Sequence, residues 1–107
     1  MMEEGVRRRA AAIFASLGHP NRLAIVELLL DGEMTVTEIV QRLGMPQPTV
    51  SNHLAALTRA GALLVEQRGT YRFFRPRGPR IGRMLKLIRQ YCHAQGLEDF
   101  SEEEDDE

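Results

Sequence analysis

The stretch TVTEIVQRLGMPQPTVSNHLAALTRAG, residues 35–61, decides the fold of this chain. Apolar side chains recur in it every three or four residues, which is the spacing of a helix with one buried face. They form a short set before Gly44 and a longer set before Gly61, and each glycine can end a helix. Two helices, over residues 35–43 and about 47–60, joined by a short turn, predict a helix-turn-helix. Their inner faces carry Val36, Ile39, Val40 and Leu43, and then Val50, Leu54 and Leu57.

The outer face of the second of these helices is polar near its start. In a helix-turn-helix that binds DNA, the early residues of the second helix enter the major groove and meet base edges. Short or planar hydrogen-bonding side chains without negative charge suit that position. The same composition is typical of a solvated helix face, which is the simpler interpretation. The candidate groove-facing residues are Gln47, Thr49, Ser51, Asn52 and His53.

Two further helices are expected before this stretch. Residues 3–17 place apolar side chains three and four apart, and Gly18-His19-Pro20-Asn21 reads as a break followed by a new helix start. Residues 23–30 are apolar nearly all round, so we expect the second helix to lie in the centre of the core.

A β-hairpin is expected after the helix pair. Residues 63–68 and 71–75 are rich in β-forming side chains and flank a Gly-Thr turn. Arginines on or near such a hairpin can hold phosphate oxygens. The candidate phosphate contacts are Arg42, Arg59, Arg68 and Arg72. The aromatic side chains that we expect to anchor the hairpin to the helices are Tyr71, Phe73 and Phe74.

A last helix begins after Pro79 and carries a long apolar stripe. One small domain offers a limited core to cover this stripe and that of the first helix. We therefore expect a twofold interface between two copies of the chain, although packing within one subunit is the alternative. Such a dimer would place two recognition helices about one DNA turn (~34 Å) apart. The candidate interface residues are Ile13, Ile81, Met84, Leu85, Ile88, Tyr91 and Cys92.

The charge of the chain is unevenly distributed. Its 107 residues carry a formal net charge of −1, but eight of the 15 acidic residues lie among the last ten. The first 97 residues hold all 14 basic residues and seven acidic ones, a net charge of +7. This asymmetry favours a polyanionic partner. We expect one domain over residues 1–97 and a disordered acidic tail over residues 98–107, which either solubilises the protein or competes with phosphate.

Several classes of protein are excluded by composition. The single Cys92 cannot form an intrachain disulfide, so a disulfide-stapled secreted scaffold is excluded. No apolar run approaches the ~18–20 residues that span a bilayer, and the chain does not begin like a signal peptide. We therefore expect a soluble cytoplasmic protein without a membrane partner.

Two motifs resemble the ArsR/SmtB family of winged-helix repressors. SLGHPNRL at residues 16–23, followed by IVELL at 25–29, is similar to the opening signature of that family. QPTVSNHLAAL at residues 47–57 resembles its recognition helix. The resemblance implies a mainly α fold with a β-hairpin wing, in the order four helices, two strands and a last helix. It also implies a homodimer that represses by covering a palindromic operator and releases it when an effector binds.

The residues of the family's metal sites are missing from this chain. Metal-sensing members often carry two cysteines in the segment that corresponds to residues 33–39, where this chain has Thr35 and Thr37. In the last helix only Cys92 and His93 stand near the second family site, and adjacent helical residues diverge by about 100°. We expect no metal, no cofactor and an unidentified effector. The alternative is a metal- or thiol-sensing repressor that uses Cys92 and His93.

An enzyme is not expected. Ser51 and His53 are two residues apart on one helix and do not face each other, and no glycine-rich phosphate loop is present. The competing interpretation from another class is a winged-helix module that binds a protein partner and never contacts DNA.

Overall fold

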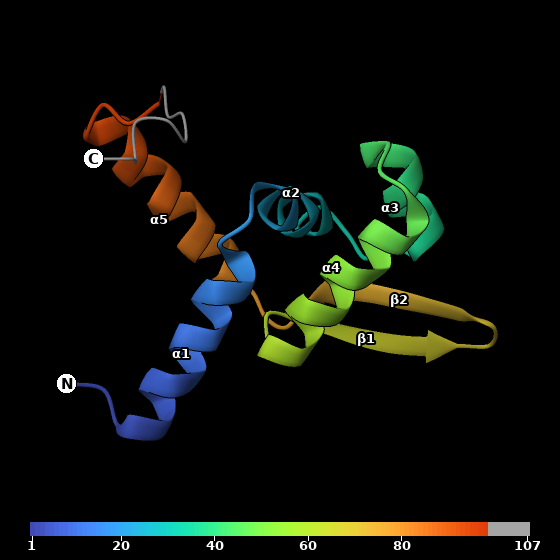
Figure 1. Ribbon diagram of the computed structural model, residues 1–107, viewed down its shortest axis with the longest axis horizontal. Coiled ribbons are helices and arrows are strands. Elements are labelled where there is room, and N and C mark those ends of the chain that lie inside the picture. Colours follow the sequence, from blue (N-terminus) through green and yellow to red (C-terminus); the bar gives the residue numbers. More distant parts are fainter. Residues whose placement is uncertain (99–107) are drawn as a thin grey trace.

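The computed structural model describes residues 1–98, and the predicted helix-turn-helix lies at one end of it (Figure 1). Helix α3 (Val36–Leu43) begins with a capping box between Thr35 and Glu38, which satisfies two backbone N–H groups. It ends at Gly44, whose φ of 69° is the left-handed conformation that glycine adopts without strain. Helix α4 (Gln47–Ala60) has the bounds that the sequence predicts.

Helices α1 (Glu4–Leu17) and α2 (Pro20–Leu29) precede this pair. The predicted break between them is confirmed, because His19 is the N-cap of α2 and its Nδ1 accepts a hydrogen bond from the backbone N–H of Asn21 (3.1 Å). Helix α2 runs between α1 on one side and α3 and α4 on the other (Figure 1). Its inward residues Ile25, Val26 and Leu29 are almost fully buried, as expected for the central helix.

Strands β1 (Leu63–Arg68) and β2 (Tyr71–Pro76) form an antiparallel hairpin that projects from the body as a wing (Figure 1). The sequence did not predict a third segment beside β2: Met34 pairs with Phe74 through two backbone hydrogen bonds of 2.8 and 3.1 Å. Phe74 is buried and anchors the wing, as predicted. The prediction for Tyr71 is wrong, since this side chain lies near the tip of the wing and is 63% exposed.

Helix α5 (Arg80–Ala94) follows the wing and lies near α1, at the end of the molecule opposite the wing tip (Figure 1). Its first turn contributes Ile81 to the main core, which otherwise comes from the inner faces of the four preceding helices and the start of the wing. The rest of α5 is largely exposed. The predicted acidic tail comprises residues 98–107, and all of it except Glu98 lies outside the described residues. No helix within residues 1–98 combines the length and the apolar character needed to cross a membrane.

Candidate nucleic-acid interface

The first turns of α4 present a polar surface to solvent. Gln47, Ser51 and Asn52 are exposed, and Thr49 is half-buried. The N-cap residue is Pro46, which provides no side-chain hydrogen bond to this end of the helix. The positive end of the helix dipole therefore accompanies these neutral hydrogen-bonding side chains at the surface.

The position of His53 corrects the sequence prediction. Its side chain is 8% exposed and lies on the inner face of α4, where the Nε–H of Arg22 donates to its Nδ1 (3.0 Å). Burial lowers the pKa of His53 below the ordinary 6.5, and the nearby His19 and Arg22 lower it further. The spacing carried this signal, because His53 is three residues after Val50 and four before Leu57. Because histidine is polar, the prediction places His53 on the outer face in spite of this spacing.

A groove of about 290 Å³ separates α4 from the wing. Ser51 and Arg59 line it from α4, and Arg72 lines it from β2. The Arg72 guanidinium carbon lies 5.6 Å from the centre of the ring of the buried Phe74, so the charged end of this side chain lies over an aromatic face. The structure thus brings together three of the predicted site residues from two elements.

Arg68 lies on the same wing but is already paired. Its Nη2 lies 2.7 Å from Oε1 of Glu33 and 3.1 Å from Oε1 of Glu66, and its guanidinium covers the Phe73 ring at 4.5 Å. The hydrogen bond from Arg68 lowers the pKa of the Glu33 carboxyl, and bonds from Arg68 and then Arg75 lower that of Glu66. Two carboxylates therefore balance two wing arginines, and this arrangement disfavours Arg68 as a phosphate contact.

No local sequence pattern predicts this cluster, because Glu33 precedes Arg68 by 35 residues. We call Glu33, Glu66, Arg68 and Arg75 the wing-base cluster. Arg72 has no ion-pair partner among residues 1–98, so it carries the unbalanced charge of the wing.

The other two predicted phosphate contacts lie at helix ends. Arg42 is exposed in the last turn of α3, and Arg59 is exposed in the last turn of α4. Arg9 of α1, which the sequence did not single out, donates to the carbonyl oxygen of Ala60 (2.9 Å) and so binds the negative end of α4. Among these basic side chains, Arg9 therefore holds the end of the helix, whereas Arg42 and Arg59 make no such contact among residues 1–98.

The predicted interface residues separate into three groups. Ile81 belongs to the core of the subunit, which corrects its assignment to an interface, and Ile13 and Leu85 pack against that core. Met84, Ile88 and Tyr91 are exposed and line a groove of about 550 Å³ between α1 and α5. Cys92 is half-buried and lines a separate groove between α2 and α5.

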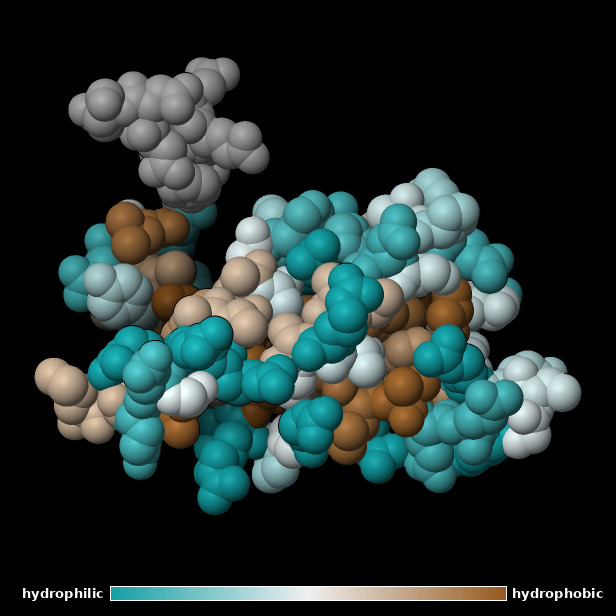
Figure 2. All heavy atoms as spheres, turned by 60° about the horizontal axis from the view of Figure 1, so that its bottom comes forward, coloured by the Kyte–Doolittle hydropathy of each residue, from teal (hydrophilic) through white to brown (hydrophobic). Residues whose placement is uncertain are grey.

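The α1–α5 groove contains two large exposed side chains that the predicted set omitted. Phe14 is 61% exposed and Leu87 is 65% exposed. Hydrophobic surface, drawn in brown, is visible in Figure 2 on the part of the molecule that leads to the grey residues. We call Phe14, Met84, Leu87, Ile88 and Tyr91 the apolar face.

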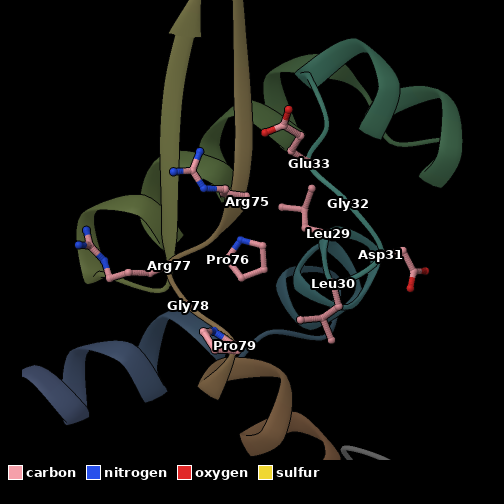
Figure 3. Close-up of a pocket in the computed structure, with 10 residues that line it drawn as sticks. All are labelled: Leu29, Leu30, Asp31, Gly32, Glu33, Arg75, Pro76, Arg77, Gly78 and Pro79. Atoms are coloured by element: carbon pink, nitrogen blue, oxygen red, sulfur yellow. The ribbon is translucent and has the colours of Figure 1, made fainter.

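A larger hollow of about 610 Å³ lies between the turn after α2 and the chain that leads from β2 into α5 (Figure 3). Figure 3 shows Asp31 pointing away from it, while Glu33 lies beside β2, the strand that carries Arg75. Glu33 and Arg75 already belong to the wing-base cluster. The hollow therefore brings no new set of polar groups together.

The two residues of the alternative metal or thiol site point to different neighbours. Nδ1 of His93 lies 2.8 Å from Oε2 of Glu98, whereas Cys92 faces the α2–α5 groove. Within residues 1–98, no three His, Cys, Asp or Glu side chains gather in a way that could hold a metal ion.

Comparisons with known proteins agree with this geometry. The family model described as "Bacterial regulatory protein, arsR family" matches residues 19–65. An uncharacterized HTH-type transcriptional regulator of Methanocaldococcus jannaschii, MJ1325, is 40% identical over 75% of this chain and 91% of its own length. The transcriptional activator HlyU of Vibrio cholerae is 31% identical over 80% of this chain and 81% of its own length.

Solved structures show the same architecture. The homodimeric winged helix-turn-helix DNA-binding domain of Mb0332 from Mycobacterium bovis, a possible ArsR-family regulator, has a TM-score of 0.77 at 26% identity. The similarity covers 87% of this chain and 89% of that one. The repressor BigR of Xylella fastidiosa has a TM-score of 0.69 at 29% identity, over 85% of this chain and 96% of that one. The chain therefore belongs to the arsR family of bacterial regulatory proteins, and it is a winged helix-turn-helix transcriptional regulator rather than an enzyme.

Proposed function

We propose that this regulator is a cytoplasmic homodimeric repressor that binds double-stranded DNA at a palindromic operator. Helix α4 reads base edges with Gln47, Thr49, Ser51 and Asn52, while the wing holds the phosphate backbone. The observation that carries the proposal is the groove between α4 and the wing, where Ser51 lies opposite Arg72. A neutral hydrogen-bonding group and an unbalanced cation on two neighbouring elements suit base and phosphate contacts, respectively.

The apolar face supports the dimer. Five large apolar side chains on α1 and α5 are exposed in the single chain, and contiguous apolar surface of this kind is typical of an interface. The M. bovis relative is homodimeric. In a twofold dimer the two copies of α4 can occupy successive turns of the major groove, about 34 Å apart.

The wing contact is tested with Arg72→Ala. Each neutralised phosphate releases counterions, so the variant should bind specific and random DNA more weakly and lower the salt dependence by about one phosphate contact. Fluorescence anisotropy with labelled duplex over a range of KCl concentrations measures both. Arg89→Ala on α5 is the matched control, because it removes the same charge outside the proposed interface, and it should change neither quantity.

A second experiment separates this proposal from the alternative of a protein-interaction module that does not bind DNA. A gel shift against the DNA upstream of the gene, with random competitor, should show a specific complex. Failure to form any specific complex would favour the interaction module. Equal affinity and salt dependence for Arg72→Ala and the unmodified protein would instead remove the wing from the interface.

We also propose that the effector that releases the operator is not a metal ion held by Cys92 and His93. The two side chains face different neighbours, which supports this part of the proposal. Metal titration of the protein bound to operator should leave its affinity unchanged, and Cys92→Ser and His93→Ala should behave in the same way. Metal-dependent release that either variant abolishes would contradict it.

A further inference from the structure

A polar cluster lies beneath α4, on the side away from the proposed DNA surface. It consists of His19, Arg22 and His53, which come from the start of α2 and from the inner face of α4. The rings of the two histidines are 4.8 Å apart between centroids and are tilted by 57°. Arg22 donates through Nε to His53 (3.0 Å), and its Nη1 lies 3.5 Å from the carbonyl oxygen of Ser16 at the end of α1.

The hydrogen bond fixes the chemical state of His53. Nδ1 accepts a hydrogen bond from a guanidinium that is always charged, so Nδ1 itself carries no hydrogen and the ring is the neutral Nε2–H tautomer. Within residues 1–98 this is the single side-chain hydrogen bond that joins α2 to α4. The apolar face of α4 decides which side of the helix is buried, and the Arg22–His53 bond adds one polar contact that a proton can remove.

We propose that Arg22 and His53 position the recognition helix, and that protonation of His53 at Nδ1 weakens DNA binding by releasing this tie. This inference rests on the proposed function of α4. His53 follows Asn52 directly and is one helical turn after Thr49, so a rotation of α4 that moves the inner ring also moves both outer side chains. Arg22 and His53 are positioning residues, because neither needs to contact DNA.

The surroundings of His53 oppose its protonation. His19 faces it from the start of α2 and Arg22 from the first turn of that helix, and both act against a positive charge on the ring. No carboxylate of residues 1–98 is among the groups that shift its pKa. A proton on Nδ1 would turn the acceptor into a donor and place two cations in contact. The tie is thus complete above the ordinary histidine pKa of 6.5 and is lost at lower pH.

The test compares the DNA affinity of three proteins between pH 5 and pH 8. The unmodified protein should lose affinity as the pH falls, approaching about tenfold per pH unit for each His53 of the complex below the pKa of that residue, the limit for one proton. His53→Asn places an amide Oδ1 near the position of Nδ1, so it keeps an acceptor that does not titrate. This variant should bind at neutral pH within a few-fold of the unmodified protein and show a flatter pH profile.

Two further variants complete the design. His53→Leu removes the acceptor and should bind weakly at every pH. His19→Asn keeps an N-cap for α2, because asparagine is a preferred N-cap residue. It also removes one of the two groups that oppose a proton on His53, so the loss of affinity should begin at a higher pH and remain as steep as in the unmodified protein. The proposal is overturned if His53→Asn retains the full pH dependence, or if His53→Leu binds as tightly as the unmodified protein at pH 7.5.

A measurement without DNA separates this inference from the proposed function. Thermal unfolding should show a melting temperature that falls more steeply with decreasing pH in the unmodified protein than in His53→Asn. If no protein binds any DNA but this difference is present, the proposed function fails and the Arg22–His53 tie stands. If the two melting curves respond to pH identically, the tie itself is disproved.

Discussion

Individual side chains of α4 serve either the core or the outer surface, and their position in the helical turn decides which. Val50, Leu54 and Leu57 are almost fully buried, whereas Gln47 and Ser51 are exposed. A buried leucine stabilises the subunit through apolar area removed from water. An exposed polar residue contributes little to stability, so it is free to determine which base pair is bound.

Gln47→Ala and Leu57→Ala should therefore have opposite effects. Gln47→Ala should lower discrimination at one base pair of each half-site by about 1–3 kcal/mol and leave the free energy of unfolding nearly unchanged. Leu57→Ala should lower the free energy of unfolding by about 2–5 kcal/mol without changing the preferred sequence of the folded fraction. Competition binding with single-base operator variants, combined with urea denaturation, measures both. A changed base preference in Leu57→Ala but not in Gln47→Ala would contradict the assignment of faces.

The residues of α4 also show what can and cannot be predicted from the sequence. Periodicity predicts the bounds of α4 and its apolar stripe, because leucines at helical spacing share one face that can be buried. The same spacing places His53 on that face, but it does not show that a polar ring can be buried there, since its burial requires a partner, Arg22, that is 31 residues away in the chain. A buried imidazole is tolerated only when it is hydrogen-bonded, and that condition depends on tertiary structure.

At the scale of elements, the wing is attached to the helices by backbone and charge together. The Met34–Phe74 bridge joins β2 to the segment before α3, and Glu33 in that segment binds Arg68 on β1. The hairpin was predictable because its turn and strands are local. The attachment was not, because pairs so far apart in the chain leave no periodic signal.

Glu33→Gln tests the charge balance of the wing-base cluster. Removing this charge leaves Glu66 as the one carboxylate paired with both Arg68 and Arg75 within residues 1–98. The variant should therefore bind random DNA more tightly, and its salt dependence should rise by up to about one phosphate contact. Glu27→Gln on α2 is the control, because it makes the same change in net charge away from the wing. Fluorescence anisotropy at several salt concentrations measures the affinity and salt dependence of the two variants. Equal shifts for the two variants would show that only net charge matters.

The contribution of this cluster to the stability of the fold should decrease as the pH falls, whereas that of a paired cation decreases as the pH rises. The pKa values of Glu33 and Glu66 lie below their ordinary 4.5, so the cluster stabilises the fold above that pH and is lost as the pH falls through the folded values. Because His53→Asn removes the titrating imidazole and leaves this cluster intact, comparison of that variant with the unmodified protein separates the two effects.

At the scale of the whole molecule, the proposed DNA surface and the apolar face lie at opposite ends of the chain (Figure 1). Helix α3, the start of α4 and the wing tip occupy one end, and α1 and α5 the other, while the last turn of α4 contacts α1. Two copies joined through α1 and α5 would therefore have their recognition helices far from the joint. The sequence predicted an apolar stripe on α5, but which of its residues remain exposed depends on how α5 packs, as Ile81 and Leu87 show.

Leu87→Glu tests whether the apolar face holds the dimer together. This side chain is exposed in the single chain, so a glutamate should cost the folded subunit little, but burial of its charge between two subunits would be strongly unfavourable. Sedimentation equilibrium should give twice the chain mass of 12.1 kDa for the unmodified protein and a single chain mass for the variant. Gln90→Glu, which adds the same charge at an exposed position of α5 outside the groove, should remain dimeric.

The same pair of variants links the dimer to DNA binding. Leu87→Glu should bind an isolated half-site about as well as the unmodified protein, because its α4 and wing are intact. It should lose most of the additional affinity for the complete palindrome, since two linked half-sites gain from a high effective concentration only when the subunits are joined. Gln90→Glu should retain this advantage. A Leu87→Glu protein that is still dimeric, or a monomer that still prefers the palindrome over the half-site, would show that a different surface joins the subunits.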